Sequence, residues 1–176
     1  MIKVSLGPDS RPEGRGPGGL PLNLNCYARL TMKGRILCPI DFSEASIEAL
    51  KCAIEIARKE RMGITVLFSY RLIEMEQGEE IMHFKNKMEA SAREKFSAIE
   101  HFFDNGVSTD YEFVIEIGFF SDCISRQIRT APVAKVVIAN GMRPLLNDKH
   151  LNQTPFLYSL SVPVIVVGAT GETALL

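Results

Sequence analysis

An aspartate stands directly after the apolar run Ile36–Ile40, and a serine, Ser43, follows two residues later. The aliphatic run predicts a buried central strand whose carboxyl end opens into a loop at Asp41. In an open parallel sheet, ligands bind outside the carboxyl ends of the strands, where the strand order reverses. Asp41 therefore marks an expected binding site. Its carboxylate also has an ordinary structural use, which is to accept hydrogen bonds from N–H groups of its own loop.

A second group of polar residues follows the apolar segment 133–139. Asn140 and Gly141 come first, and a polar loop from 142 to 153 then carries Arg143, Lys149 and His150. The side chains of these three residues are suited to binding an anion. A solvated loop without a ligand has the same composition.

Other candidates for chemistry are weak. His83 and His101 lie on one predicted helix, about 27 Å apart along its axis, so they cannot share a metal ion. The four cysteines show no C-x-x-C spacing, and no G-x-S-x-G motif is present. Glu112 and Glu116 share one face of a predicted strand, where we expect a solvated surface rather than an acid/base pair. No metal site and no catalytic residue are predicted.

The elements that would position these residues alternate along the chain. Apolar runs predict five strands, at 36–40, 64–70, 111–117, 133–139 and 162–167. Helices are expected after Ser43 as far as Gly63, over 79–104 with a buried stripe from Phe84 to Phe103, after a capping Ser121, and over 155–160. The alternation predicts an α/β doubly wound parallel sheet, with 111–117 at an edge because its polar residues alternate.

Composition limits the function further. The chain has 176 residues, a formal net charge of −1 and a pI of about 6.3, with 46% hydrophobic residues. This balance is typical of a globular domain and argues against a nucleic-acid partner, and no apolar run is long enough to span a membrane. The scattered cysteines favour a reducing, cytoplasmic location, with Cys38, Cys52 and Cys123 as buried thiols.

Three segments differ in composition. Residues 1–31 are rich in glycine and proline and predict a flexible leader, or a start codon assigned upstream of Met32. Residues 32–170 are expected to form a single domain, and residues 171–176 a short tail.

The opening Ile36–Ser43 with Glu44–Leu50, the strand 136–141 and the closing Ser161–Val167 together resemble the universal stress protein family. The resemblance covers residues 33–168. It implies a flavodoxin-like (Rossmann-like) sheet of five parallel strands in the order 3-2-1-4-5, with helices on both faces. It also implies a cytoplasmic homodimer paired through the last strand, a role in the stress response, and kinship with adenine nucleotide alpha hydrolases.

Many family members bind ATP or AMP. If this chain bound a nucleotide as those members do, the resemblance implies that the ligand would contact Pro39, Ile40, Asp41, Phe68, Asn140, Gly141, Arg143 and Thr154. The family's phosphate loop reads Gly-x-x-Gly, nine residues, then Gly-Ser or Gly-Thr. Here Gly141 matches the first glycine, but Pro144 replaces the second and Thr154-Pro155 the final pair. Because proline has no N–H group, both prolines remove donors that a phosphate would use.

These observations favour a non-catalytic regulatory or interaction domain that acts as a dimer and with a protein partner, without an obligatory cofactor and without usual ATP binding. A small anionic ligand at the Asp41/Gly141 crevice is compatible with it. The alternative is an ATP- or AMP-dependent switch or slow ATPase in which Arg143 and Lys149 replace the missing donors. An adenylate-forming enzyme is a third hypothesis, but residues 41–46 lack the glycine that its phosphate loop needs.

Overall fold

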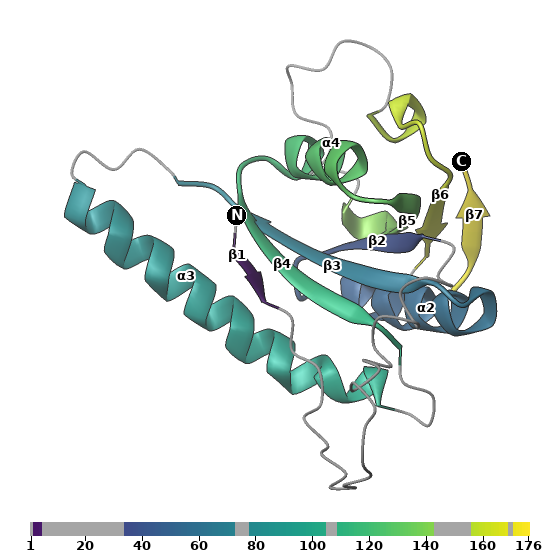
Figure 1. Cartoon of the computed structure of the whole chain (residues 1–176), viewed down its shortest axis with the longest axis horizontal. Coiled ribbons are helices and arrows are strands. Elements are labelled where there is room, and N and C mark those ends of the chain that lie inside the picture. The colour runs from purple at the N-terminus through teal and green to yellow at the C-terminus, as the bar shows by residue number, and fades with distance from the viewer. Residues whose placement is uncertain (1, 5–33, 73–77, 105–108, 143–155, 169–170) are drawn as a thin grey trace, which may run out of the picture.

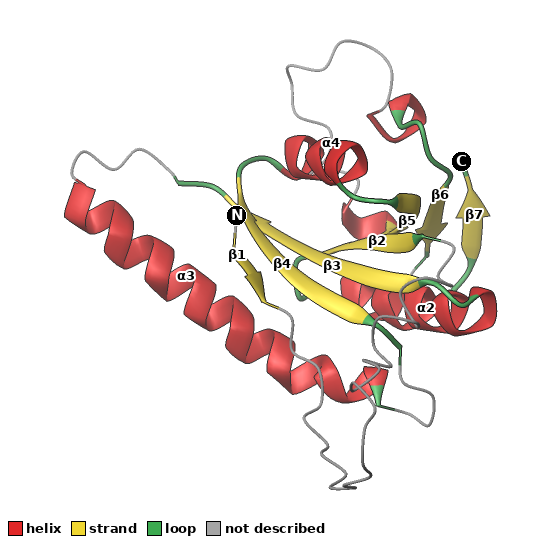
Figure 2. Cartoon of the chain, viewed as in Figure 1, coloured by secondary structure: helices red, strands yellow, loops and turns green. Residues whose placement is uncertain are grey.

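The computed structural model describes residues 2–4, 34–72, 78–104, 109–142, 156–168 and 171–176. The strands are β1 (Ile2–Val4), β2 (Arg35–Ile40), β3 (Gly63–Tyr70), β4 (Tyr111–Ile117), β5 (Val133–Ala139), β6 (Val164–Val167) and β7 (Thr173–Leu175). The α-helices are α2 (Glu44–Glu60), α3 (Gly78–Ile99) and α4 (Phe120–Thr130), and short 3-10 helices follow at η1 (Glu100–Phe103), η2 (Asn140–Met142) and η3 (Phe156–Ser159). Figures 1 and 2 show these elements as one twisted sheet with helices packed against it.

The sheet has the order β1-β4-β3-β2-β5-β6-β7. Its five inner strands are parallel and, numbered along the chain from β2, follow the order 3-2-1-4-5. The predicted fold class and strand order are therefore confirmed. The described part of the sheet has two strands more than predicted, because β1 pairs antiparallel with β4 and β7 pairs antiparallel with β6.

These added strands change both edges of the predicted sheet. The expectation that 111–117 forms an edge strand is wrong, since β4 lies between β1 and β3. The last parallel strand, β6, is likewise covered on its outer side by β7. The segments 1–31 and 171–176, expected as a flexible leader and a tail, each contribute one of these strands.

Helices cover both faces of the sheet, as predicted. The helices α2 and α3 lie on one face and α4 lies on the other (Figure 1). Alanines at four-residue spacing, Ala49, Ala53 and Ala57, are almost completely buried and allow α2 to pack closely against the central strands. On α3 and η1, the predicted apolar stripe is buried from Ala92 to Phe103, while Phe84 and Met88 are only partly buried.

Two predicted helix boundaries are wrong. The helix α2 ends at Glu60, with Arg61 as its C-cap in the left-handed conformation at φ 59°, and Gly63 is instead the first residue of β3. The helix α4 has Phe119 at its N-cap, and Ser121 is buried in the first turn rather than capping it. In both places a residue next to the predicted cap, Arg61 or Phe119, is the actual cap of the helix. Sequence patterns place helix ends only to within one or two residues.

Candidate functional site

The carboxyl end of β2 lies where the strand order reverses. The ladder between β2 and β3 runs to Ile40, but the ladder between β2 and β5 ends at Leu37. Pro39 follows that end and has no N–H group with which to extend a ladder. The strands β2 and β5 therefore cease to pair before the loop that carries Asp41, which is the position expected for a ligand site in this fold.

The side chain of Asp41 is bound within its own turn. One carboxylate oxygen, Oδ1, accepts hydrogen bonds from the backbone N–H of Ser43 at 2.9 Å and from its hydroxyl at 2.5 Å. The hydroxyl of Ser43 in turn accepts from the N–H of Ser46 at 3.3 Å and caps α2, as predicted. Burial alone would raise the pKa of Asp41, but these hydrogen bonds, with a contribution from the Ser46 hydroxyl, outweigh it and lower the pKa below its usual value.

Phe42 connects this turn to the aromatic residues of the neighbouring strands. Its backbone has φ 64°, in the left-handed region, and its ring centroid lies 5.2 Å from that of Phe68 and 6.3 Å from that of Phe113. The ammonium group of Lys95 lies 5.7 Å from the centroid of the Phe42 ring. Phe68 lies near the carboxyl end of β3, is half-buried, and packs against the ring of Phe42.

The end of β5 approaches the same place from the other side. Asn140 and Gly141 are exposed in η2. A Cβ atom built on Gly141 would lie 3.7 Å from the Cβ of Ala45, in the first turn of α2. The structure therefore brings Gly141 close to the start of α2.

The remaining predicted site residues differ in accessibility. Pro39 and Ile40 are buried in β2, and Ile40 has no exposed surface, so both serve the core in this structure. Arg143 and Thr154 lie outside the described residues, as do Pro144, Lys149, His150 and Pro155.

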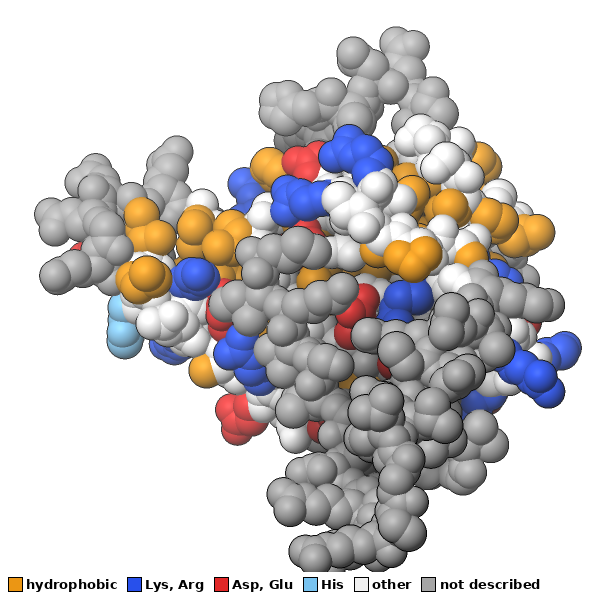
Figure 3. Space-filling view, viewed as in Figure 1, with side chains coloured by type: hydrophobic (Ala, Val, Ile, Leu, Met, Phe, Trp, Pro, Cys, Tyr) orange, Lys and Arg blue, Asp and Glu red, His pale blue; other side chains and the backbone are white. Residues whose placement is uncertain are grey.

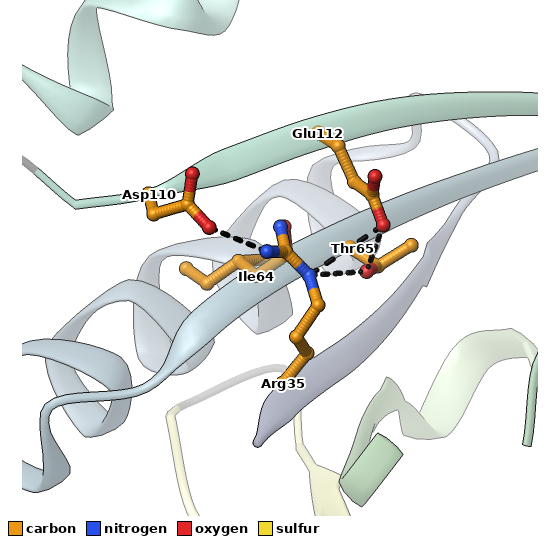
Figure 4. A network of polar contacts seen from close by, with 5 residues as sticks. All are labelled: Arg35, Ile64, Thr65, Asp110 and Glu112. Carbon is orange, nitrogen blue, oxygen red and sulfur yellow. Dashed lines mark hydrogen bonds and ion pairs between the residues drawn. The ribbon is translucent and has the colours of Figure 1, made fainter. Parts of the chain in front are cut away.

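A partly buried ionic network at the opposite, amino end of the strands was not predicted. Figure 4 shows Arg35 of β2 between Asp110 and Glu112. The guanidinium forms an ion pair with Asp110 and donates to Thr65 Oγ1 at 2.9 Å and to the Ile64 carbonyl at 2.6 Å. Glu112 Oε1 lies 3.5 Å from Arg35 Nε and accepts from the Thr65 hydroxyl at 2.9 Å.

The prediction that Glu112 and Glu116 form a solvated surface is wrong, because both residues are buried. Glu112 is 8% exposed and Glu116 is 3% exposed. Glu116 accepts hydrogen bonds from Gln127 at 2.5 Å and from Arg126 at 2.9 Å, both on α4. Each buried carboxylate is thus matched by donors from another element. The alternation of polar and apolar residues along β4 suggested an exposed face. Its two glutamates instead lie where the side chains of Arg35, Arg126 and Gln127 contact the sheet.

The described residues show no group of three or more His, Cys, Asp or Glu side chains arranged to hold a metal ion. Within the same residues, no helix is both long enough and apolar enough to cross a membrane. On the face shown in Figure 3, acidic and basic side chains are intermixed with apolar ones.

Comparison with solved structures identifies the architecture. A universal stress protein, UspA from Lactobacillus plantarum, superposes with a TM-score of 0.60 at 16% sequence identity, covering 77% of this chain and 97% of that one. A protein of the universal stress protein family from Burkholderia pseudomallei gives 0.60 at 15% identity, covering 78% and 97%. The chain has the universal stress protein fold.

A third protein with the universal stress protein fold was solved in complex with cAMP; it gives a TM-score of 0.54 at 14% identity and covers 77% of this chain and 96% of that one. No family model matches the sequence. No curated protein matches it either. The structural likeness thus extends over nearly the whole of each relative, while the sequence identities are low.

Proposed function

We propose that this chain is a universal-stress-type regulatory domain that acts in the cytoplasm through protein contacts, including contacts with a second copy, and does not bind ATP in the manner of its nucleotide-binding relatives. The observation that carries the proposal is the retained scaffold combined with the loss of phosphate donors. The strands β2 and β5 and the Asp41 turn are in place. In the loop that follows Gly141, Pro144 and Thr154-Pro155 stand where the nucleotide-binding pattern has glycines and an N–H donor.

The state of Asp41 is consistent with this proposal. A carboxylate that recognises a ligand must exchange its own hydrogen bonds for bonds to that ligand, and Oδ1 is already occupied by two donors from Ser43. The lowered pKa of Asp41 reflects these bonds, which favour the ionised carboxylate within its own turn.

The alternative function is an adenine-nucleotide switch. A specific observation favours it: a protein with this fold and a TM-score of 0.54 was solved with cAMP. In that case Arg143 and Lys149 would supply side-chain donors in place of the lost amides.

The two functions can be distinguished by identifying the small molecules that remain bound to the purified protein and by measuring nucleotide binding. The regulatory proposal predicts no stoichiometric nucleotide when the protein is denatured and the supernatant is analysed by mass spectrometry, and no heat of binding with ATP, ADP or AMP and magnesium. Stoichiometric release of an adenine nucleotide, or micromolar affinity for ATP, would establish the switch instead. A variant with Arg143→Ala and Lys149→Ala is the control, because it weakens only a side-chain-dependent site.

A further inference from the structure

The first turns of α3 extend past the sheet. Figure 1 shows the helix beginning well beyond the carboxyl ends of β3 and β4, whereas Phe96, further along α3, stacks on Phe113 of β4 with ring centroids 4.2 Å apart. Met82, near the start of the helix, is 57% exposed. On the face shown in Figure 3, hydrophobic side chains gather at this end of α3. The beginning of α3 therefore carries apolar surface outside the core.

The apolar stripe of α3 turns away from the sheet toward the amino end of the helix. Phe84, Met88, Ala92 and Phe96 follow one another at intervals of four residues. Each interval rotates the side chain by about 40° around a straight helix, so Phe84 and Phe96 point in directions about 120° apart. Because of this rotation, Ala92 and Phe96 are buried while Phe84 and Met88 are only partly buried. With the half-buried Ile81, they form an apolar face that the sheet does not fully cover, the Ile81/Phe84/Met88 face.

The charges beside this face are complementary to themselves. The spacing 81, 84, 88 is that of the a and d positions of a coiled coil, and Glu80 and Lys87, both exposed, occupy the two neighbouring g positions. When two such helices pair antiparallel with their a and d positions facing, residue 81 of one copy lies opposite residue 84 of the other. Glu80 of each copy then lies beside Lys87 of the other, and the two-fold axis forms this contact twice.

We propose that the Ile81/Phe84/Met88 face of α3 binds the same face of a second copy of this chain in antiparallel orientation. The inference rests on the proposed function, in which the domain acts through protein contacts, and it names one surface and its partner. Three apolar residues from each helix make a small contact, so the dimer is weak and reversible. Its exposed ion pairs make the affinity fall as the salt concentration rises.

Charge reversal tests this pairing. Glu80→Lys and Lys87→Glu should each lower the dimer affinity about tenfold, because each reversal brings like charges together twice in the two-fold pair. The double variant E80K/K87E restores opposite charges and should recover the affinity of the natural chain. Sedimentation velocity over a concentration series measures these affinities, and circular dichroism confirms that each variant is folded. Glu94→Lys is the matched control, since it reverses an exposed glutamate further along α3 and should leave the affinity unchanged.

Three results of this series would overturn the proposal. The first is a natural chain that stays monomeric at every concentration. The second is a dimer that neither single reversal weakens, which would place the contact on another surface. The third is a double variant whose affinity stays as low as that of the single variants.

A pair of cysteines tests the orientation. Residues 80 and 87 lie about 10.5 Å apart along α3, too far for a disulfide within one chain. In a background with Cys26→Ser and Cys52→Ser, E80C/K87C should form a covalent dimer on oxidation that a reducing agent reverses. The single E80C variant is the control and should not crosslink, because residue 80 of one copy lies opposite residue 87 of the other. Equal crosslinking of the single and double variants would contradict the antiparallel alignment.

These measurements are independent of nucleotide. Failure of the α3 proposal would leave the nucleotide titrations unchanged, and ATP binding by the natural chain would leave the effect of the charge reversals unchanged. The two proposals can therefore fail separately.

Discussion

Asp41 illustrates how one carboxylate can serve the fold at a position where a ligand is expected. Its hydrogen bonds with Ser43 close the turn that begins α2, and they favour the ionised form. The sequence raised both the structural and the binding role, and the geometry of the turn shows the structural role directly.

The lowered pKa of Asp41 predicts a pH dependence of stability. A depressed folded-state pKa stabilises the protein above the usual pKa of aspartate, and this contribution disappears as the pH falls through the folded-state value. Asp41→Asn should therefore lower the free energy of unfolding at pH 7 by up to about 1 kcal/mol, and the difference should shrink in acid. Urea denaturation at pH 7 and pH 3 measures both values. A difference that stays constant with pH would contradict this account of the turn.

Gly63 is a second residue whose role becomes clear only in the structure. A Cβ atom there would lie 2.8 Å from Arg35 Nη1 and 3.1 Å from Asp110 Oδ2. Because these two atoms form the ion pair of the partly buried network, Gly63→Ala should cost about 1–3 kcal/mol of unfolding free energy. Gly141→Ala is the matched control, since its nearest neighbour is at an ordinary 3.7 Å. Equal unfolding midpoints for the two variants would show that the Arg35 network accommodates the methyl group.

At the scale of elements, Arg58 joins α2 to the end of η1. Its guanidinium donates from Nη2 to the carbonyls of Phe102 and Phe103, both at 3.1 Å, and from Nε to Thr109 Oγ1 at 3.3 Å. The carbonyls at a helix terminus have no partners within the helix, so a planar cation from a neighbouring helix is an effective partner for them.

Arg58→Lys retains the charge but not the forked geometry, so it should lower the free energy of unfolding by about 1–2 kcal/mol. Lys59→Ala, which removes an exposed neighbour on the same helix, should change it by less than about 0.5 kcal/mol. Thermal and urea denaturation of both variants provide the test. Full stability of the lysine variant would mean that charge alone holds η1.

The sequence predicted some elements better than others for physical reasons. The five inner strands followed from apolar runs, which report burial on both faces of a parallel sheet, whereas their order came from the family resemblance. The edge strands β1 and β7 were missed because three residues are too few to show periodicity, and their pairing depends on tertiary context. Glu112 and Glu116 were misassigned since a buried carboxylate and an exposed one look alike until the donors Arg35, Arg126 and Gln127 are placed.

At the scale of the whole molecule, the described residues contain the parallel sheet and the turns of the universal stress protein fold. The strand order reverses between β2 and β5, and the turn at Asp41 follows β2. Gly141 lies close to the first turn of α2. The sequence predicts where a ligand would bind because that position follows from the topology of the sheet. The occupancy of that position does not follow from topology, because it depends on the backbone donors of the loop after Gly141.

The most direct test restores those donors. Pro144→Gly, Thr154→Gly and Pro155→Ser, combined, return the glycines and the N–H groups at the spacing of the nucleotide-binding loop. Isothermal titration of both chains with ATP and magnesium compares them on one scaffold. We predict no measurable binding by the natural chain and acquired binding by the triple variant. Micromolar ATP binding by the natural chain would contradict the central claim that its phosphate donors are lost.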